Sequence, residues 1–170
     1  MPAELIIRPE RPDDHVAIGA LITAAFAGKP YADGDEADLL VALRREHALT
    51  LSLVAELRGR VVGQAAFSPA RPADAAQSWY GIGPVAVLPA HQRIGIGSRL
   101  VRAGLEILTG LGAGGCIVVG DPAYYTRFGF RVCPENAPAG QPADHFMVKV
   151  LGSRRPDGPI RFHEAFGGAA

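Results

Sequence analysis

The amino-terminal part of the chain carries apolar residues at the spacing of one helix face. They recur at intervals of three and four residues and are Ile18, Leu21, Ile22, Ala25 and Phe26. Such a stripe is typical of an amphipathic helix. We place the start of this helix at Asp13, because aspartate caps helices and because Pro9 and Pro12 break the β-rich run ELIIR at residues 4–8.

A second amphipathic helix is predicted after a loop at residues 28–34. Asp35 stands where its side chain can cap this helix. The helical spacing then predicts three buried leucines, which are Leu39, Leu40 and Leu43.

The middle of the chain has the composition of β-strands. Residues 50–57 and 60–68 are β-rich runs, and the two residues between them, Arg58 and Gly59, form a connection of the length found in hairpins. Residues 70–77, ARPADAAQ, are predicted to form an exposed loop.

A further strand is predicted at residues 79–88, although Gly81, Gly83 and Pro84 lie inside it. Proline donates no hydrogen bond to a neighbouring strand, and glycine weakens a strand. We therefore expect this strand to be bulged or splayed away from its neighbour.

The second half of the chain begins with a glycine-rich turn that opens a helix. The residues that this helix is predicted to bury are Ile96, Leu100, Val101, Leu105, Leu108 and Leu111. Glycines at 112–115 are expected to end it, and CIVV at 116–119 reads as a buried strand. Asp121 and Pro122 should start a short helical turn that Gly129 ends.

The last predicted strands lie at residues 130–132 and 146–151, and the segment after Gly152 is expected to be an irregular packed segment or a frayed end. The order of elements is that of an α+β protein whose front half is antiparallel. A length of 170 residues fits one domain, so we assign residues 1–170 to a single domain.

The composition argues against some classes of binding partner. Lys and Arg together number 17, as do Asp and Glu, so no net charge draws the protein to nucleic acid or to an anionic membrane. We see neither a signal peptide nor an apolar run of the roughly 18 residues that span a bilayer, and we expect a cytoplasmic protein. Cys116 and Cys133 lack metal-ligand spacing, so we expect reduced thiols and no metal, with Cys116 filling the core.

Residues 91–100, HQRIGIGSRL, carry the main chemical signal. Glycines at a helix start let an anion approach unpaired backbone N–H groups and the positive end of the helix dipole. A P-loop is excluded because no Gly-Lys-Ser/Thr follows. A dinucleotide-binding turn that uses Asp121, and a turn that serves only helix packing, remain open as alternatives.

The residues around this turn resemble those of a known family. VAVLP at 85–89 with the following QRIGIG at 92–97 resembles the pyrophosphate-binding motif Q/R-x-x-G-x-G/A of the GNAT superfamily of acetyl-CoA-dependent N-acetyltransferases. GDPAYYTRFGF at 120–130 resembles the family's Tyr-x-x-x-Gly-Phe segment in a small bacterial branch, and VAELRGRVVG at 54–63 fits the strands before the motif. The resemblance covers about residues 4–150, and it implies a mixed, mostly antiparallel sheet, splayed at strands four and five and flanked by helices.

The resemblance also implies acetyl-CoA as cosubstrate. The implied cofactor-binding residues are Val85, Ala86, Val87, Gln92, Arg93, Ile94, Gly95, Ile96, Gly97, Ser98 and Tyr125. The pantetheine arm would pair with the backbone of Val85 and Val87 between the splayed strands.

The implied reaction is direct transfer of the acetyl group to a primary amine in a ternary complex. By resemblance, the N–H of Val87 stabilises the negative charge that develops on the thioester oxygen. Tyr125 would protonate the departing thiolate, with Tyr124 as its rival. Asp35 and Glu36 are candidates for the general base, and His91 is more typical of a structural or surface histidine.

Two other functions remain open at this point. A non-catalytic acyl-CoA-binding module would use the same turn without a need for Tyr125. An NAD-binding oxidoreductase would depend on Asp121. The acceptor implied by the resemblance is a small-molecule or peptide amine, and GNAT proteins often form homodimers.

Overall fold

The computed structural model describes residues 4–30, 32, 34–74, 76–152 and 154–167. Its helices are α1 (His15–Phe26), α2 (Glu36–Arg45), α3 (Ile96–Gly110) and α4 (Pro122–Tyr125). Its strands are β1 (Leu5–Pro9), β2 (Leu51–Leu57), β3 (Arg60–Pro72), β4 (Trp79–Val87), β5 (Gly115–Val119), β6 (Arg131–Val132), β7 (Phe146–Val150) and β8 (Ile160–Arg161). The predicted strands and helices are therefore present, in the predicted order.

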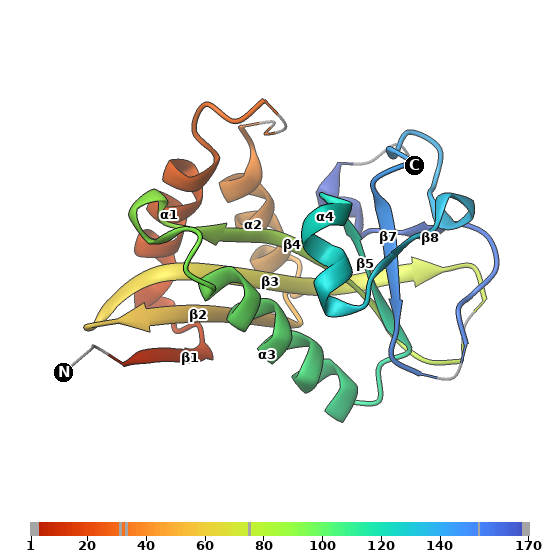
Figure 1. Cartoon of the computed structure of the whole chain (residues 1–170), viewed down its shortest axis with the longest axis horizontal. Helices are drawn as coiled ribbons and strands as arrows, with labels where there is room; N and C mark the ends of the chain where they lie inside the picture. Colours follow the sequence, from red (N-terminus) through yellow and green to blue (C-terminus); the bar gives the residue numbers. More distant parts are fainter. Residues whose placement is uncertain (1–3, 31, 33, 75, 153, 168–170) are drawn as a thin grey trace. The chain divides into compact units, whose positions relative to one another are not determined.

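The strands form one mixed sheet in the order β1-β2-β3-β4-β5-β7-β6, with β8 paired to β3 (Figure 1). Strands β4 and β5 run parallel, whereas β1–β2, β5–β7 and β6–β7 are antiparallel pairs. This arrangement confirms the predicted α+β class and the antiparallel front half.

Backbone contacts divide the chain into two compact units. The first comprises residues 1–66 and 83–104, and the second comprises residues 67–82 and 105–170. Strands β3 and β4 and helix α3 each continue from one unit into the other.

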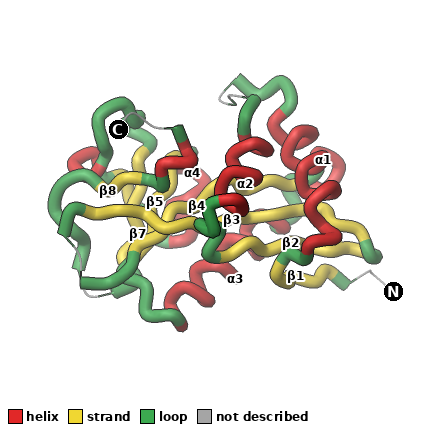
Figure 2. Tube along the Cα trace, turned by 180° about the vertical axis from the view of Figure 1, so that it is seen from behind, coloured by secondary structure: helices red, strands yellow, loops and turns green. Residues whose placement is uncertain are grey.

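Helices α1 and α2 lie side by side in the first unit (Figures 1 and 2). The buried members of their core cluster are Ile18, Leu21, Ile22, Ala25, Leu40, Val54, Ala66 and Ala86. Phe26 packs against this cluster, and Leu43 is fully buried. The predicted apolar faces are confirmed, except that Leu39 is only half-buried.

The prediction that Asp13 caps α1 is wrong. Asp13 lies exposed in a 3-10 turn, η1 (Pro12–Asp14), and α1 begins only at His15. The next carboxylate, Asp14, accepts hydrogen bonds from two nitrogens of Arg8 at 2.7 and 3.0 Å and from the backbone N–H of Arg11 at 2.7 Å. This carboxylate thus ties the turn to β1 instead of capping the helix.

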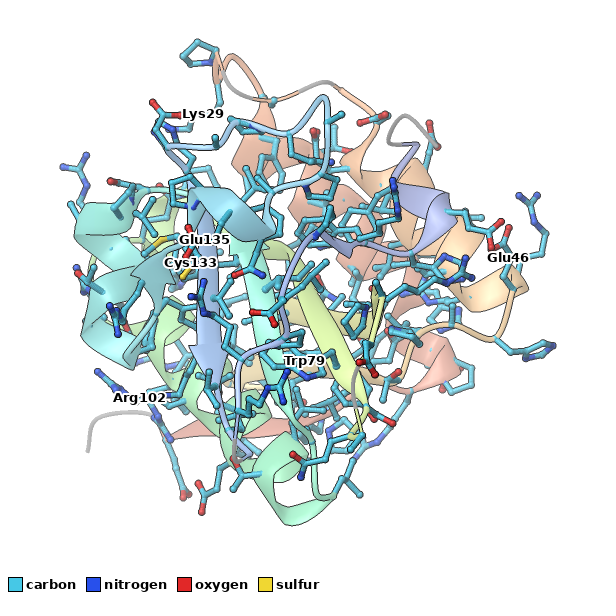
Figure 3. All side chains as sticks on the ribbon, turned by 90° about the vertical axis from the view of Figure 1, so that its right-hand side faces the viewer. Lys29, Glu46, Trp79, Arg102, Cys133 and Glu135 are labelled. Carbon is cyan, nitrogen blue, oxygen red and sulfur yellow. The ribbon has the colours of Figure 1, made fainter. Side chains whose placement is uncertain are left out.

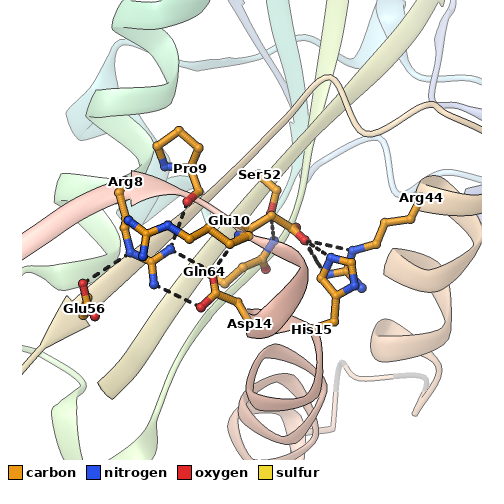
Figure 4. A network of polar contacts seen from close by, with 10 residues as sticks. Arg8, Pro9, Glu10, Asp14, His15, Arg44, Ser52, Glu56 and Gln64 are labelled. Carbon is orange, nitrogen blue, oxygen red and sulfur yellow. Dashed lines mark hydrogen bonds and ion pairs between the residues drawn. The ribbon is translucent and has the colours of Figure 1, made fainter. Parts of the chain in front are cut away.

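Further charged side chains make polar contacts near this pair in the first unit (Figure 4). Arg8 also reaches Glu56 on β2 at 3.3 Å. Glu10 lies 2.9 Å from both His15 on α1 and Arg44 on α2. Arg8 therefore joins β1 to β2, and Glu10, directly after β1, joins the chain there to both helices.

The loop regions were predicted with mixed success. The hairpin turn is confirmed, because Arg58 and Gly59 both have positive φ, at 53° and 76°, as a type I′ turn requires. Asp35 occupies the cap position of α2 but makes no capping hydrogen bond. The loop at 28–34 is irregular where the structure describes it, and positions 31 and 33 lie outside the described residues.

The exposed loop predicted at 70–77 begins too early. Strand β3 continues to Pro72, and Ala70 is buried. The reason is β8, whose Arg161 and Ile160 pair with Arg71 and Pro72. A two-residue strand shows no periodicity in the sequence, so β8 was missed; position 75 lies outside the described residues.

Strand β4 pairs with β5 only at its start, as its glycines and proline predict. The register with β5 covers Trp79, Tyr80 and Gly81, although β4 continues to Val87. Gly83, with φ of 150°, follows this paired stretch. The expectation that β4 is splayed away from its neighbour is therefore confirmed.

The second unit has its own apolar core around β5 and β7. The buried members of this cluster are Ala70, Trp79, Ile117, Cys133, Phe146, Val148 and Ile160. The indole of Trp79, labelled in Figure 3, packs over Gly114 and Gly115, where an added Cβ would overlap atoms of the ring. Those two positions therefore require glycine.

The end of α3 differs from the prediction. Helix α3 stops at Gly110, Gly112 has a φ of +80° in the turn that follows, and Gly115 already belongs to β5. Leu111 was expected to be buried, but 65% of it is exposed, because the helical spacing no longer applies beyond Gly110. Within the described part of the chain, no helix has the length and apolar character that crossing a bilayer requires.

The Arg8–Asp14 pair generates a prediction about acid stability. Hydrogen bonds from Arg8 lower the pKa of Asp14 to about 2 from an ordinary value of 3.8. A lowered folded-state pKa stabilises the protein above the unfolded pKa, and this stabilisation is lost as the pH falls from about 4 toward 2.

We expect Asp14→Asn to reduce the free energy of unfolding at pH 7 by about 1–2 kcal/mol, and the difference from wild type to shrink as the pH falls from about 4 toward 2. Urea unfolding at several pH values measures both effects. Asp13→Asn, at the exposed neighbouring position, is the matched control. A difference between Asp14→Asn and wild type that stays constant from pH 7 to pH 2 would contradict this assignment.

Candidate functional site

The carboxyl end of β4 presents one edge that faces away from β3. The N–H of Leu88 donates to the carbonyl of Val62 on β3 at 2.9 Å. Because N–H groups alternate along a strand, those of Val85 and Val87 point to the opposite edge. The register between β4 and β5 ends at Gly81, so neither N–H belongs to that strand pairing. Two donors on one strand edge suit an extended ligand with amide carbonyls.

A tight turn follows this strand. It consists of a 3-10 turn, η2 (Pro89–His91), and a segment in which Arg93 and Gly95 have φ of 66° and 90°. No atom lies within 4 Å of a Cβ built on Gly95, and Ile94 is largely exposed. The outer surface of the turn is therefore open.

The inner side of the turn is fixed by close packing on β3. Ile96, the first residue of α3, is buried, as is Leu100 one turn later. A Cβ built on Gly63 would lie 3.1 Å from Ile96 Cγ2 and 3.0 Å from Leu100 Cδ1. Gly63 thus allows the start of α3 to sit directly on β3, and sequence reasoning missed this residue because it lies 30 positions before the turn.

The start of α3 is electrostatically suited to an anion. The N–H groups of Ile96 and Gly97 lie in the first turn of α3, where no earlier turn of the helix supplies a carbonyl to accept their hydrogen bonds. The helix dipole adds positive electrostatic potential at the same end. Arg93 is exposed in the same turn, and Ser98 is half-buried in the first turn of the helix. A phosphate group is the kind of ligand that such a helix start binds.

Gln92 links the turn to the strand. Its side-chain Nε2 donates to the carbonyl of Val87 at 2.9 Å. The residues predicted to bind the cofactor between 85 and 98 therefore lie together in the first unit. His91 lies in the same turn, half-buried, and its Nδ1 is buried without a hydrogen-bond partner among the described residues.

A second cluster surrounds α4 in the second unit. Asp121 caps this helix by accepting from the N–H of Ala123 at 2.9 Å, and Gly129, with φ of 91°, ends the following 3-10 turn, η3 (Thr126–Phe128). Both features confirm the sequence prediction. The capping role accounts for Asp121 without the ribose contact that a dinucleotide-binding protein would make.

The two candidate tyrosines have different surroundings. The ring of Tyr125 packs directly over Gly120, where an added Cβ would overlap it, and lies 5.9 Å from the ring of Phe130. The ring of Tyr124 is covered by the guanidinium of Arg127 at 4.4 Å. Gly120 positions Tyr125 but was missed by sequence reasoning, since glycine beside an Asp-Pro helix start reads as part of the turn.

The remaining candidates are placed as follows. Asp35 is exposed before α2, and Glu36 is half-buried at its first position. Cys116 and Cys133 are free and buried. Burial raises the pKa of Cys116 to about 12, so its thiol is protonated at neutral pH and fills the core as predicted. Among the described residues, no group of three or more His, Cys, Asp or Glu side chains is arranged to hold a metal ion.

Comparison with known proteins identifies similar chains. The model of the acetyltransferase (GNAT) family matches residues 16–130. The uncharacterized N-acetyltransferase YhbS of Escherichia coli K12 is 37% identical over 129 residues, which are 75% of this chain and 74% of YhbS.

Two solved structures are similar over almost the whole chain. A GNAT family acetyltransferase from Brucella melitensis, in complex with acetyl-CoA, is 44% identical, with a TM-score of 0.85 over 96% of this chain and 98% of its own. Escherichia coli YhbS in complex with CoA is 32% identical, with a TM-score of 0.88 over 98% of this chain and 94% of its own.

The packing of Tyr125 on Gly120 generates a second prediction. Gly120→Ala places a methyl group where the ring of Tyr125 lies, so we expect the ring to move and the free energy of unfolding to fall by about 1–3 kcal/mol. Thermal unfolding and the near-ultraviolet circular dichroism of the aromatic rings measure the two effects. Gly110→Ala, where no atom lies within 4 Å, is the control. Equal behaviour of the two variants would mean that Gly120 does not hold the ring in place.

Proposed function

The chain belongs to the GNAT family of N-acetyltransferases, and from this premise we propose that it binds acetyl-CoA and transfers the acetyl group directly to a primary amine. The observation that carries the proposal is the helix start of α3, open at Gly95, that follows the donor edge of β4. The amine acceptor in this proposal is a small molecule or a peptide. The whole chain, residues 1–170, would act as one acetyltransferase domain.

The proposed cofactor site uses main-chain groups. The pyrophosphate would lie on the N–H groups at the start of α3, with Gly95 and Gly97 leaving room for its oxygens. A pantetheine amide would pair with Val85 along the free edge of β4, and the N–H of Val87, further along the same edge, would face the thioester. Support comes from the geometry of the turn and from relatives at 44% and 32% identity that were solved with acetyl-CoA and with CoA.

The proposed chemistry needs a donor at each of two atoms. As the amine nitrogen attacks the thioester carbon, negative charge develops on the carbonyl oxygen, which the N–H of Val87 would stabilise. When the carbon–sulfur bond breaks, the phenol of Tyr125 would give its proton to the thiolate. The acylated nitrogen would lose its surplus proton to solvent, and the phenolate would regain a proton from solvent. A phenol with a pKa near ~10 is protonated at neutral pH and can serve a thiol whose pKa is near ~8.5.

Tyr125 is preferred to Tyr124 for a structural reason, although the Tyr124 ring also packs against other rings, 5.0 Å from Tyr125 and 5.3 Å from Phe128. The ring of Tyr125 is seated directly on the backbone at Gly120, whereas a face of the Tyr124 ring is covered by Arg127. A proton donor must hold one orientation through the reaction, and a ring fixed by close packing does so.

The cofactor assignment is tested by calorimetric titration with acetyl-CoA, with NAD and ATP as controls. We expect saturable binding of acetyl-CoA alone. Gly97→Glu should weaken this binding by about tenfold or more, because a carboxylate would occupy the place of the pyrophosphate. Gly110→Glu adds the same charge in the last turn of α3 and should bind like wild type. Binding of NAD instead would support the oxidoreductase, and unchanged affinity of folded Gly97→Glu would remove the phosphate site from this turn.

The catalytic assignment is tested by release of CoA from acetyl-CoA in the presence of a panel of primary amines. We expect Tyr125→Phe to lower kcat by about 100-fold while acetyl-CoA affinity stays within a few-fold of wild type. Tyr124→Phe is the matched control and should retain most of the turnover. The opposite pattern would make Tyr124 the donor, and binding of acetyl-CoA without turnover by wild type would favour the non-catalytic module.

A further inference from the structure

The peptide group between Val87 and Leu88 is held from both sides. Its N–H donates to the carbonyl of Val62 at 2.9 Å, and its C=O accepts from Gln92 Nε2 at 2.9 Å. The first bond belongs to the sheet, whereas the second comes from a side chain in the turn that precedes α3. The side-chain amide of Gln92 therefore binds the end of β4 and does not extend toward the open surface of the turn.

The carbonyl that Gln92 binds lies on the same edge as a proposed catalytic donor. In an extended strand the N–H and the C=O of one residue point to the same side. The C=O of Val87 therefore lies beside the N–H of Val87. A bare carbonyl oxygen there would repel the negative charge that this N–H is proposed to stabilise.

The chemistry of the amide fixes which end of Gln92 faces the strand. A carbonyl only accepts hydrogen bonds, so the NH₂ group of Gln92, and not its oxygen, must lie against it. Its N–H dipole places partial positive charge against the carbonyl oxygen. The bond also fixes the direction of the peptide group, since it opposes the bond to Val62.

We propose that Gln92 is a positioning residue for acetyl transfer, which caps the Val87 carbonyl so that this edge of β4 presents a donor alone to the thioester oxygen. This inference rests on the proposed function and adds to it a role for the Gln92 side chain. Under it, Gln92 acts on the polarisation of the thioester through Val87 and contributes little to holding the pyrophosphate.

Three substitutions at Gln92 distinguish the effect of its N–H donor from the effect of its side-chain length. Gln92→Met keeps a similar length without a donor, and Gln92→Glu replaces the donor with a carboxylate that only accepts. Gln92→Arg keeps N–H donors and serves as the rescue variant. The matched control is Gln77→Met, which removes the same kind of bond in the other unit, from Gln77 Nε2 to the carbonyl of Gly112 at 3.2 Å.

The readout is the infrared carbonyl band of acetyl-CoA labelled with ¹³C at the acetyl carbonyl, recorded free and bound. We expect wild type to move this band to lower wavenumber. The shift should be smaller in Gln92→Met, smallest in Gln92→Glu, and retained in Gln92→Arg and Gln77→Met. The affinity for acetyl-CoA should stay within about twofold of wild type in the Met variant, while kcat falls about three- to tenfold, as expected for loss of one neutral hydrogen bond.

Two results would overturn the inference. One is a band shift in bound Gln92→Met and Gln92→Glu equal to that of wild type. The other is a tenfold loss of acetyl-CoA affinity in Gln92→Met that the Arg variant restores, which would place Gln92 in phosphate binding. Absence of acetyl-CoA binding by wild type in the same titrations would reject the proposed function itself, and the inference with it.

Discussion

The short pairing between β4 and β5 is the constraint on which the candidate site depends. The register between the two strands covers Trp79 to Gly81, whereas β4 continues to Val87. Beyond Gly81, the N–H of Leu88 is bonded to Val62 on β3, so the N–H groups of Val85 and Val87 lie on the edge that no longer pairs with β5. One strand thus pairs on both sides at its start and keeps a donor edge for a ligand at its end, with Gly83 between the two parts.

The turn after this strand depends on a second close approach. Gly63 lets Ile96 and Leu100 lie directly against β3, so the first turn of α3 is anchored by burial on one side. On the opposite side, a Cβ built on Gly95 would have no neighbouring atom within 4 Å. An anion site at a helix start needs both features. The N–H groups must be held in a fixed direction, and the anion must still be able to reach them.

The sequence predicted the elements well where periodicity or turn chemistry determines them. The faces of α1 and α2, the type I′ hairpin at Arg58-Gly59 and the Asp121 cap follow from local rules and were confirmed. The predictions were wrong where a contact with a residue far away in the sequence determines the local structure. Asp14 rather than Asp13 forms the contact because Arg8 lies on the neighbouring strand, and Ala70 is buried because β8 returns to pair beside it. The splay of β4 from β5 could be predicted because glycine and proline interrupt that strand.

The candidate site was predicted from glycines and not from reactive side chains, because the groups that form it belong to the backbone. The groups proposed to hold acetyl-CoA and to stabilise the oxyanion are backbone N–H groups, which every residue type except proline supplies. Selection for such a site therefore appears in the sequence as residues that shape the backbone, such as Gly83, Gly95 and Gly97. The acceptor side requires recognition by side chains, and in this chain Asp35 and Glu36 read equally well as the start of a helix. The family and the cofactor turn could thus be predicted from local sequence, whereas the contacts of Gln92 and Gly120 required the folded chain.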